Sequence, residues 1–194
     1  MQVINFYMCL LQQRDEELVQ AFPTRKPSYF FNSFFIQSLL INDGKYNYAN
    51  IRRWTRKVDV FQQDKIFFPI NISNMHWTLI VVFMSAKEIH YYDSMSGNGE
   101  KYLQGLKKWL EDESLDKKKV AYDTSDWTLH QQEKHIPQQT NGVDCGMFSL
   151  ICSDFLSDDL ITLNYHQRDM LAFREKVGIA IIRGQLTYPL LSTR

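Results

Sequence analysis

A chain of 194 residues has the length of one globular domain, since domains usually contain about 100–200 residues. Hydrophobic residues make up 44% of the sequence and aromatic residues 14%, a composition that excludes an intrinsically disordered chain. The 22 basic and 22 acidic residues balance, so the net charge gives no reason to expect a nucleic-acid or membrane partner. We expect one monomeric domain that spans residues 1–194.

The first third of the chain is predicted to be helical, because its apolar residues recur at helical spacing. The three predicted helices cover residues 4–18, 30–40 and 51–54. The second is the most apolar, and we expect Phe34 and Phe35 in the core. The first helix begins without a capping residue, so we expect that the natural domain starts further upstream.

The middle of the chain changes to the pattern of strands. Strands are predicted over residues 65–70, 77–83, 88–92 and 127–130. The second is apolar on both faces, as in a buried central strand, and a short turn at residues 85–87 predicts a hairpin with the third.

The remaining segments are loops and helices. An amphipathic helix is predicted over residues 102–110, a solvated charged stretch over 116–119, loops over 94–99 and 137–144, and helices from residue 145 and over 165–185. Helices set apart from a small sheet predict an α+β fold with a central mixed sheet.

The sequence contains three cysteines, Cys9, Cys145 and Cys152, and no Cys-x-x-Cys pair. An odd and small number excludes a disulfide scaffold and a structural zinc site. Free thiols predict a reducing compartment, the nucleus or the cytoplasm. No apolar run approaches the ~20 residues of a membrane span, and the N-terminus lacks the basic region of a signal peptide.

Cys145 is the candidate nucleophile because it lies where a polar loop meets a predicted helix. The unpaired N–H groups and the dipole of the first helical turn favour a thiolate there, and Gly146 allows a substrate backbone to approach. The alternative is a buried structural cysteine, which is the commoner fate of a free thiol. We assign Cys152 and Cys9 to that structural class.

A cysteine nucleophile needs a base, and His76 is the best placed of the five histidines. It lies at the entrance to the most apolar strand. His90 lies within a strand and is expected to pack or to face solvent. The others, His130, His135 and His166, lie in polar segments.

Asp93 follows the strand that the predicted hairpin pairs with the strand after His76. The hairpin brings these two residues side by side, so the carboxylate can fix the imidazole tautomer. Taken alone, Asp93 would be interpreted as a residue that begins a turn before Ser94. Gln139, six positions before Cys145, can donate an amide N–H to an oxyanion, although a glutamine in a polar loop is usually just solvated.

The sequence gives no reason to expect a metal or another cofactor. Histidines and cysteines are sparse and far apart along the chain, which argues against ligand spacing. Gly97 and Gly99 are too weak a signal for a phosphate-binding loop.

Three motifs resemble the SUMO-specific (sentrin) proteases of the ubiquitin-like-protein protease family. They are His76-Trp77, Tyr92-Asp93-Ser94 and Pro137-Gln-Gln-Thr-Asn-Gly-Val-Asp-Cys-Gly146, in the family order His, Asp, Gln, Cys. Further agreement lies in Ile4-Asn-Phe-Tyr-Met8, Phe31-Asn-Ser-Phe-Phe35 and Arg53-Trp-Thr-Arg-Lys-Val-Asp-Val-Phe61. The resemblance covers nearly the whole chain.

The resemblance implies a papain-like α+β fold with the nucleophile at a helix N-terminus. It also implies a Cys145–His76–Asp93 triad, with Gln139 as oxyanion donor, that cleaves after the C-terminal Gly-Gly of SUMO. Precursor maturation and removal of SUMO from a lysine are both expected reactions, and SUMO and its conjugates are the expected partners.

The resemblance also implies four substrate-binding residues. Trp77 matches the tryptophan that covers the glycine tail, and Phe31, Arg53 and Trp54 match positions near the modifier. Core packing is the alternative for Trp77 and Phe31, and an ordinary surface cation for Arg53. Relatives carry a Trp-Leu-Asn-Asp type segment before the Asn-Phe-Tyr helix, where this chain has Met1-Gln2.

Two other functions stay open at this point. One is a protease for another modifier, NEDD8 or ubiquitin. The other is an inactive, truncated SUMO-binding pseudo-protease, which the missing upstream segment favours and the intact triad opposes.

Overall fold

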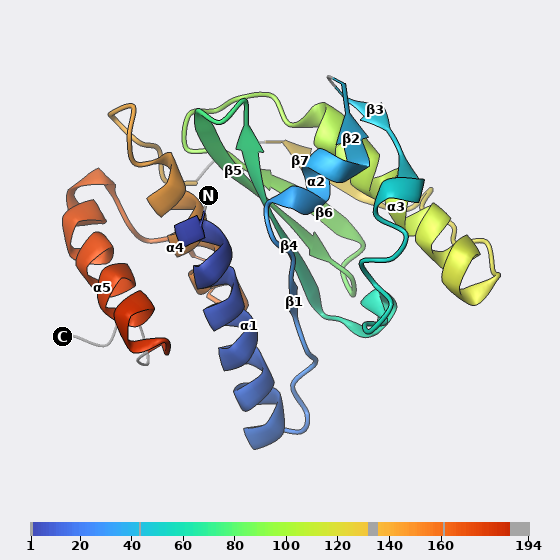
Figure 1. Ribbon diagram of the computed structural model, residues 1–194, viewed down its shortest axis with the longest axis horizontal. Coiled ribbons are helices and arrows are strands. Elements are labelled where there is room, and N and C mark those ends of the chain that lie inside the picture. The colour runs from blue at the N-terminus through green and yellow to red at the C-terminus, as the bar shows by residue number, and fades with distance from the viewer. Residues whose placement is uncertain (1, 43, 132–135, 161, 187–194) are drawn as a thin grey trace.

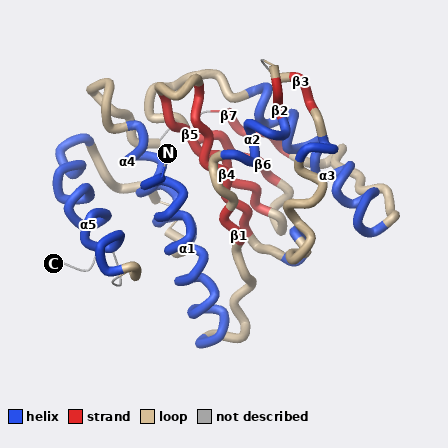
Figure 2. The backbone as a smooth tube through the Cα atoms, in the orientation of Figure 1, coloured by secondary structure: helices blue, strands red, loops and turns tan. Residues whose placement is uncertain are grey.

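The computed structural model describes residues 2–42, 44–131, 136–160 and 162–186. A five-stranded sheet stands between two groups of helices (Figures 1 and 2). This arrangement confirms the predicted α+β class with a central mixed sheet. Its strands, in spatial order, are β1 (Tyr29–Phe30), β4 (Lys65–Ile72), β5 (His76–Phe83), β6 (Glu88–Tyr92) and β7 (Thr128–Gln131).

The pairing within the sheet explains where the ends of the strands lie. The β4–β5 and β5–β6 pairs are antiparallel, whereas β1 and β7 join the two edges in parallel. The predicted hairpin is therefore confirmed: the turn between β5 and β6 contains Lys87 in the left-handed region, at φ 58°. It follows that the start of β5 and the end of β6 lie side by side, at the end of the hairpin opposite its turn.

Both faces of the sheet are buried, as the continuous apolar strands predict. One face packs against α1 (Gln2–Ala21) and α4 (Cys145–Ser157), which α5 (Met170–Arg183) covers from outside. The other face packs against α2 (Phe34–Leu39) and α3 (Glu100–Lys118) (Figure 1). Successive residues of β5 alternate between the two cores, with Leu79 facing the first group and Ile80 the second. The sheet is thus held from both sides.

Several predicted boundaries are wrong in the region of residues 29–57. The predicted helix over residues 30–40 is a single short helix, α2, between β1 and a separate hairpin of β2 (Leu40–Ile41) and β3 (Lys45–Tyr46). Phe34 is exposed whereas Phe35 is fully buried, because consecutive helical residues point about 100° apart. Residues 51–57 form turns after a short 3-10 helix, Tyr48–Asn50.

Other boundaries differ less. Residues 116–118 are the last turn of α3. The C-terminal helix begins at Met170, after a 3-10 turn at Gln167–Asp169, and a further 3-10 turn covers Val60–Gln62. His135 lies outside the described residues. Among those described, no helix is long and apolar enough to span a bilayer.

Candidate active site

His76 and Asp93 lie side by side at the open end of the β5–β6 hairpin, opposite the turn. Leu79 pairs with Tyr92, so Asp93 lies one residue past the strand, level with the first residues of β5. The Nε2 atom of His76 is 2.7 Å from Oδ1 of Asp93. The predicted juxtaposition is confirmed.

The Asp93 carboxylate is buried and enclosed by donors. Its side chain is 1% exposed, and it accepts hydrogen bonds from the N–H groups of Met95 (2.8 Å) and Gly97 (3.0 Å) and from the Tyr91 hydroxyl (3.2 Å). Burial alone would raise the pKa of Asp93, but the hydrogen bonds from His76 and from these N–H groups outweigh it and hold the pKa below its usual value. Asp93 is therefore a fixed anion at neutral pH.

Gly97 is required by this enclosure. A Cβ atom at this position would overlap Oδ2 of Asp93, so any side chain would push the carboxylate or the loop aside. The sequence marks residues 94–99 as a loop, but it does not indicate that the loop wraps around Asp93. Small residues soon after a candidate acidic residue, such as Ser94 and Gly97 after Asp93, are the signal that could have indicated this wrapping.

Cys145 is the first residue of α4, as predicted, and its side chain is near enough to the His76 ring to influence the pKa of His76. Because Nε2 of His76 faces Asp93, Nδ1 is the ring atom left for the thiol. The hydrogen bond to Asp93 raises the pKa of His76, burial opposes this rise, and the interaction with Cys145 adds to it. These contacts favour an imidazolium beside the sulfur atom, where the first N–H groups of α4 are also unpaired.

Gln139 is held close to the triad by the loop that follows Asp93. The Ser94 hydroxyl donates to Oε1 of Gln139 (2.7 Å), and the Gln139 N–H donates to the Ser94 carbonyl (3.0 Å). One N–H of the Gln139 amide donates to the Asn141 carbonyl. The second N–H of this amide is the one that can serve an oxyanion.

The turn before Cys145 is tied to the C-terminal part of the chain. Arg174 of α5 forms an ion pair with Asp144 and donates to the Val143 carbonyl (3.2 Å). Gln167 donates to Asp144 (2.6 Å) and accepts from the Thr140 N–H (2.9 Å). Burial would raise the pKa of Asp144, but hydrogen bonds from Asn141, Arg174 and Gln167 lower it. These contacts of Arg174 and Gln167 could not be predicted from the sequence, because both residues are distant along the chain from Asp144.

The four residues predicted to bind substrate are placed differently. Trp77 is half-buried, with its indole against Gly146, whose added Cβ would lie 3.4 Å from Trp77 Cδ1. A methyl group added at Gly146 would therefore touch the indole at ordinary contact distance. Arg53 is exposed, and Trp54 is half-buried with an edge-on contact to Phe35 at 5.6 Å.

Phe31 corrects the expectation of a surface contact. It is 3% exposed and stacks on Phe68 with ring centroids 4.9 Å apart. Its ring lies in the core between α2 and the sheet, which matches the alternative of core packing.

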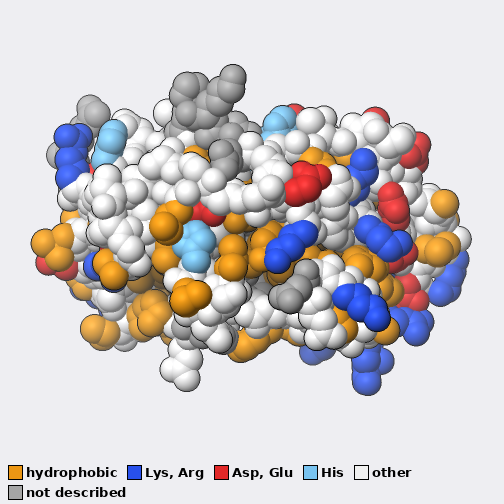
Figure 3. Space-filling view, turned by 90° about the horizontal axis from the view of Figure 1, so that it is seen from above, with side chains coloured by type: hydrophobic (Ala, Val, Ile, Leu, Met, Phe, Trp, Pro, Cys, Tyr) orange, Lys and Arg blue, Asp and Glu red, His pale blue; other side chains and the backbone are white. Residues whose placement is uncertain are grey.

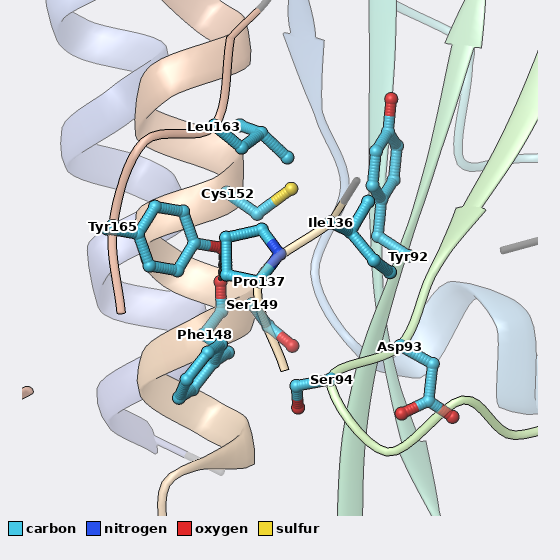
Figure 4. Close-up of a pocket in the computed structure, with 10 residues that line it drawn as sticks. All are labelled: Tyr92, Asp93, Ser94, Ile136, Pro137, Phe148, Ser149, Cys152, Leu163 and Tyr165. Atoms are coloured by element: carbon cyan, nitrogen blue, oxygen red, sulfur yellow. Dashed lines mark hydrogen bonds between the residues drawn. The ribbon is translucent and has the colours of Figure 1, made fainter. Parts of the chain in front are cut away.

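A small pocket behind the site holds the other buried cysteine (Figure 4). Cys152 faces Tyr165, Ile136 and Pro137 there, while the Asp93 carboxylate points away. Burial raises the pKa of Cys152 well above its usual value. His76 and Cys145 do not line this pocket, which agrees with the structural role predicted for Cys152. Cys9, in contrast, is exposed on α1.

Comparison with known proteins agrees with this geometry. The sequence model of the Ulp1 protease family, C-terminal catalytic domain, matches residues 1–185. A sentrin-specific protease of Caenorhabditis elegans is 37% identical over 186 residues, and human sentrin-specific protease 2 is 37% identical over 187. Each alignment covers 95% of this chain but only 25% and 30%, respectively, of the relative.

A solved structure supports the same fold. The C-terminal Ulp1 protease domain in complex with Smt3, the yeast ortholog of SUMO, superposes with a TM-score of 0.76 at 28% identity. The superposition covers 94% of this chain and 75% of that domain. The overall fold is thus shared.

Proposed function

Because the chain belongs to the Ulp1 protease family, we propose that it is a cysteine peptidase and isopeptidase that cleaves after the C-terminal Gly-Gly of SUMO. The observation that carries the proposal is the His76 ring, which hydrogen-bonds Asp93 and has its pKa raised further by Cys145 at the start of α4. Relatives named for sentrin and a SUMO-bound structural neighbour support the choice of modifier.

The reaction follows from the three residues. His76 takes the proton of the Cys145 thiol, and the thiolate attacks the carbonyl carbon of the terminal glycine. The tetrahedral intermediate collapses, the C–N bond breaks, and the lysine amine leaves with the proton from His76. Water, deprotonated by His76, then hydrolyses the thioester, which releases the SUMO carboxylate and restores the thiol.

Two further groups serve the intermediate. The Cys145 backbone N–H and the Gln139 amide are the donors that we assign to the oxyanion. Losing one such donor typically lowers the rate by ~100–1000-fold. The Ser94–Gln139 pair connects this amide to the loop around Asp93, so one loop supports both the orienting carboxylate and the oxyanion donor.

Selection of a glycine tail is assigned to Trp77 and an apolar rim. The indole lies beside Gly146, next to Cys145, and we assign to its flat face the exclusion of residues with side chains from the tail position. Met75, Met95 and Val143 are exposed and lie within two residues of His76, Asp93 and Cys145, respectively. Figure 3 shows one face of the molecule on which a histidine side chain is surrounded by hydrophobic side chains, with Lys and Arg side chains to one side of them.

Arg53 is the group that we assign to the body of the modifier. Within the described part of the chain its guanidinium is exposed and has no ion-pair partner, so it is available to an acidic side chain. Trp54 supports this segment through its contact with Phe35. We also assign the protein to a reducing compartment, the nucleus or cytoplasm, because its three cysteines are free.

The test is hydrolysis of C-terminal fluorogenic amides of SUMO, NEDD8 and ubiquitin. We expect kcat/KM to be highest for SUMO, and to collapse when its tail is changed from Gly-Gly to Gly-Ala. Faster turnover of NEDD8 or ubiquitin would assign a different modifier. Binding of SUMO without turnover by the folded chain would show a pseudo-protease.

A further inference from the structure

We propose that Glu88, His90 and His130 form a binding site for one divalent transition-metal ion of the Zn²⁺ class. The three side chains lie together on β6 and β7, away from the cysteine. Each offers one ligand atom, and these atoms all lie within 4.8 Å of one another. The site is independent of the proposed protease activity.

The sheet brings these residues together although they are distant in the sequence. β6 and β7 are parallel, with His90 directly opposite His130. Glu88 precedes His90 by two residues, so both point to the same face of β6. The spacing of histidines and cysteines along the sequence argues against a metal site. It cannot indicate residues that become neighbours only when two strands pair.

The distances are close to those that a metal ion needs. Nε2 of His90 is 2.8 Å from one carboxylate oxygen of Glu88, and Nε2 of His130 is 3.8 Å from the other. In a tetrahedral zinc site, bond lengths of about 2.0–2.2 Å place neighbouring ligand atoms roughly 3.4 Å apart. Small rotations of the Glu88 side chain therefore suffice to admit an ion between the three atoms.

The surroundings support coordination through Nε2 of His90. Its Nδ1 lies 3.4 Å from the Tyr92 hydroxyl, so Nδ1–H can donate to that oxygen while Nε2 binds metal. Such an outer partner fixes the tautomer of a ligating histidine. The side chains of His90, His130 and Glu88 are 13%, 34% and 38% exposed, which gives an ion and a water ligand access from one side.

The donor set determines the class of ion. Two imidazoles and one carboxylate suit Zn²⁺, Ni²⁺ or Cu²⁺, whereas Ca²⁺ and Mg²⁺ prefer oxygen ligands. Of the three ligands, His90 is nearest along the chain to Asp93, which follows the end of β6 three residues later, roughly 10 Å along the strand. A bound ion would therefore join the edge strand β7 to β6, and would stabilise the fold without touching the triad.

The experiment is a Zn²⁺ titration of the purified chain by chelator competition, with zinc counted after gel filtration. The variants are His130→Ala and Glu88→Gln, and the second keeps a hydrogen-bonding side chain beside both histidines. His166→Ala, at an exposed histidine outside the cluster, is the matched control. Cys145→Ala removes a thiol that could bind zinc outside this site, and circular dichroism checks that each variant is folded.

We expect one zinc per chain in the unsubstituted protein, in His166→Ala and in Cys145→Ala. His130→Ala and Glu88→Gln should each bind at least ~100-fold more weakly, because even the loss of an outer-shell partner costs ~10–100-fold. Cobalt bound at this site should also lack a sulfur-to-metal charge-transfer band. Absence of zinc binding, or zinc that is lost in Cys145→Ala and kept in His130→Ala, would overturn the proposal.

Discussion

The β5–β6 hairpin carries two histidine–carboxylate pairs with nearly equal N–O distances, but we assign the two pairs different functions. His76 and Asp93 are 2.7 Å apart, and His90 and Glu88 are 2.8 Å apart. Asp93 is enclosed by N–H and O–H donors, whereas Glu88 is substantially exposed. The first pair has Cys145 as its third member and the second has His130.

The distance within a histidine–carboxylate pair does not assign the role of that pair. An enclosed carboxylate cannot move, so it holds one imidazole in one tautomer and one direction. An exposed carboxylate between two imidazoles can rotate to share an ion. Whether a pair supports catalysis or metal binding depends on its third residue, Cys145 or His130, and on whether the carboxylate can rotate.

The largest expected effect comes from removing the charge of the enclosed carboxylate. Asp93→Asn should lower kcat by about 10⁴-fold, because an amide can present its N–H to His76 and stabilise the wrong tautomer. Asp126→Asn, at an exposed partner of Lys87, is the control and should keep its rate. If Asp93→Asn retained near-normal turnover, Asp93 would be a turn residue and the contrast between the pairs would fail.

A smaller effect is expected from crowding the same carboxylate without changing its charge. Gly97→Ala places a methyl group on Oδ2 of Asp93, and a shift of about 1 Å in a catalytic group can cost ~100-fold in kcat. Gly178→Ala, where the added methyl group meets nothing within 4 Å, should keep its activity. Equal kcat values for the two variants would show that the enclosure tolerates displacement of Asp93.

The third prediction concerns Cys145, the partner that distinguishes the first pair. Arg174→Ala removes the ion pair to Asp144 and the bond to the Val143 carbonyl. We expect a fall of about 10-fold in kcat with little change in KM, since the loosened turn misplaces the nucleophile. Arg168→Ala, at an exposed neighbouring arginine, is the comparison. An altered KM with normal kcat would place Arg174 in substrate binding instead.

The smallest effect is a pH-dependent difference in melting temperature between wild type and Asp93→Asn. Asp93 has a lowered pKa, so its contribution is present above the unfolded value of about 4 and is lost as pH falls through the folded pKa. His76 has a raised pKa, so its contribution is present below about 6.5 and is lost as pH rises through the folded pKa. The difference should be largest between about pH 4 and 6.5. A difference independent of pH would contradict a charged pair.

Local pattern was enough to predict the core of the site. A short turn between two apolar strands forces an antiparallel hairpin, so His76 and Asp93 had to meet. The passage from a polar loop to a helical apolar run placed Cys145 at a helix start. These features depend on neighbours within a few residues along the chain or across one tight turn.

Features that depend on distant neighbours could not be predicted. Phe30 is a strand residue because it pairs with Phe67 in β4, and Phe31 is buried because Phe68 and Trp109 lie against it. A short apolar run reads equally well as a helix until those partners are known. The same limit hid the pairing of His90 with His130.

The two buried cysteines of α4 give the most direct test of which residue is the nucleophile. A SUMO probe with a C-terminal electrophile should form one covalent adduct, which peptide mapping places on Cys145. The adduct should disappear in Cys145→Ala and persist in Cys152→Ala, because Cys152 is enclosed and burial raises its pKa. An adduct that persists in Cys145→Ala, or that maps to Cys152, would contradict the assignment of the nucleophile.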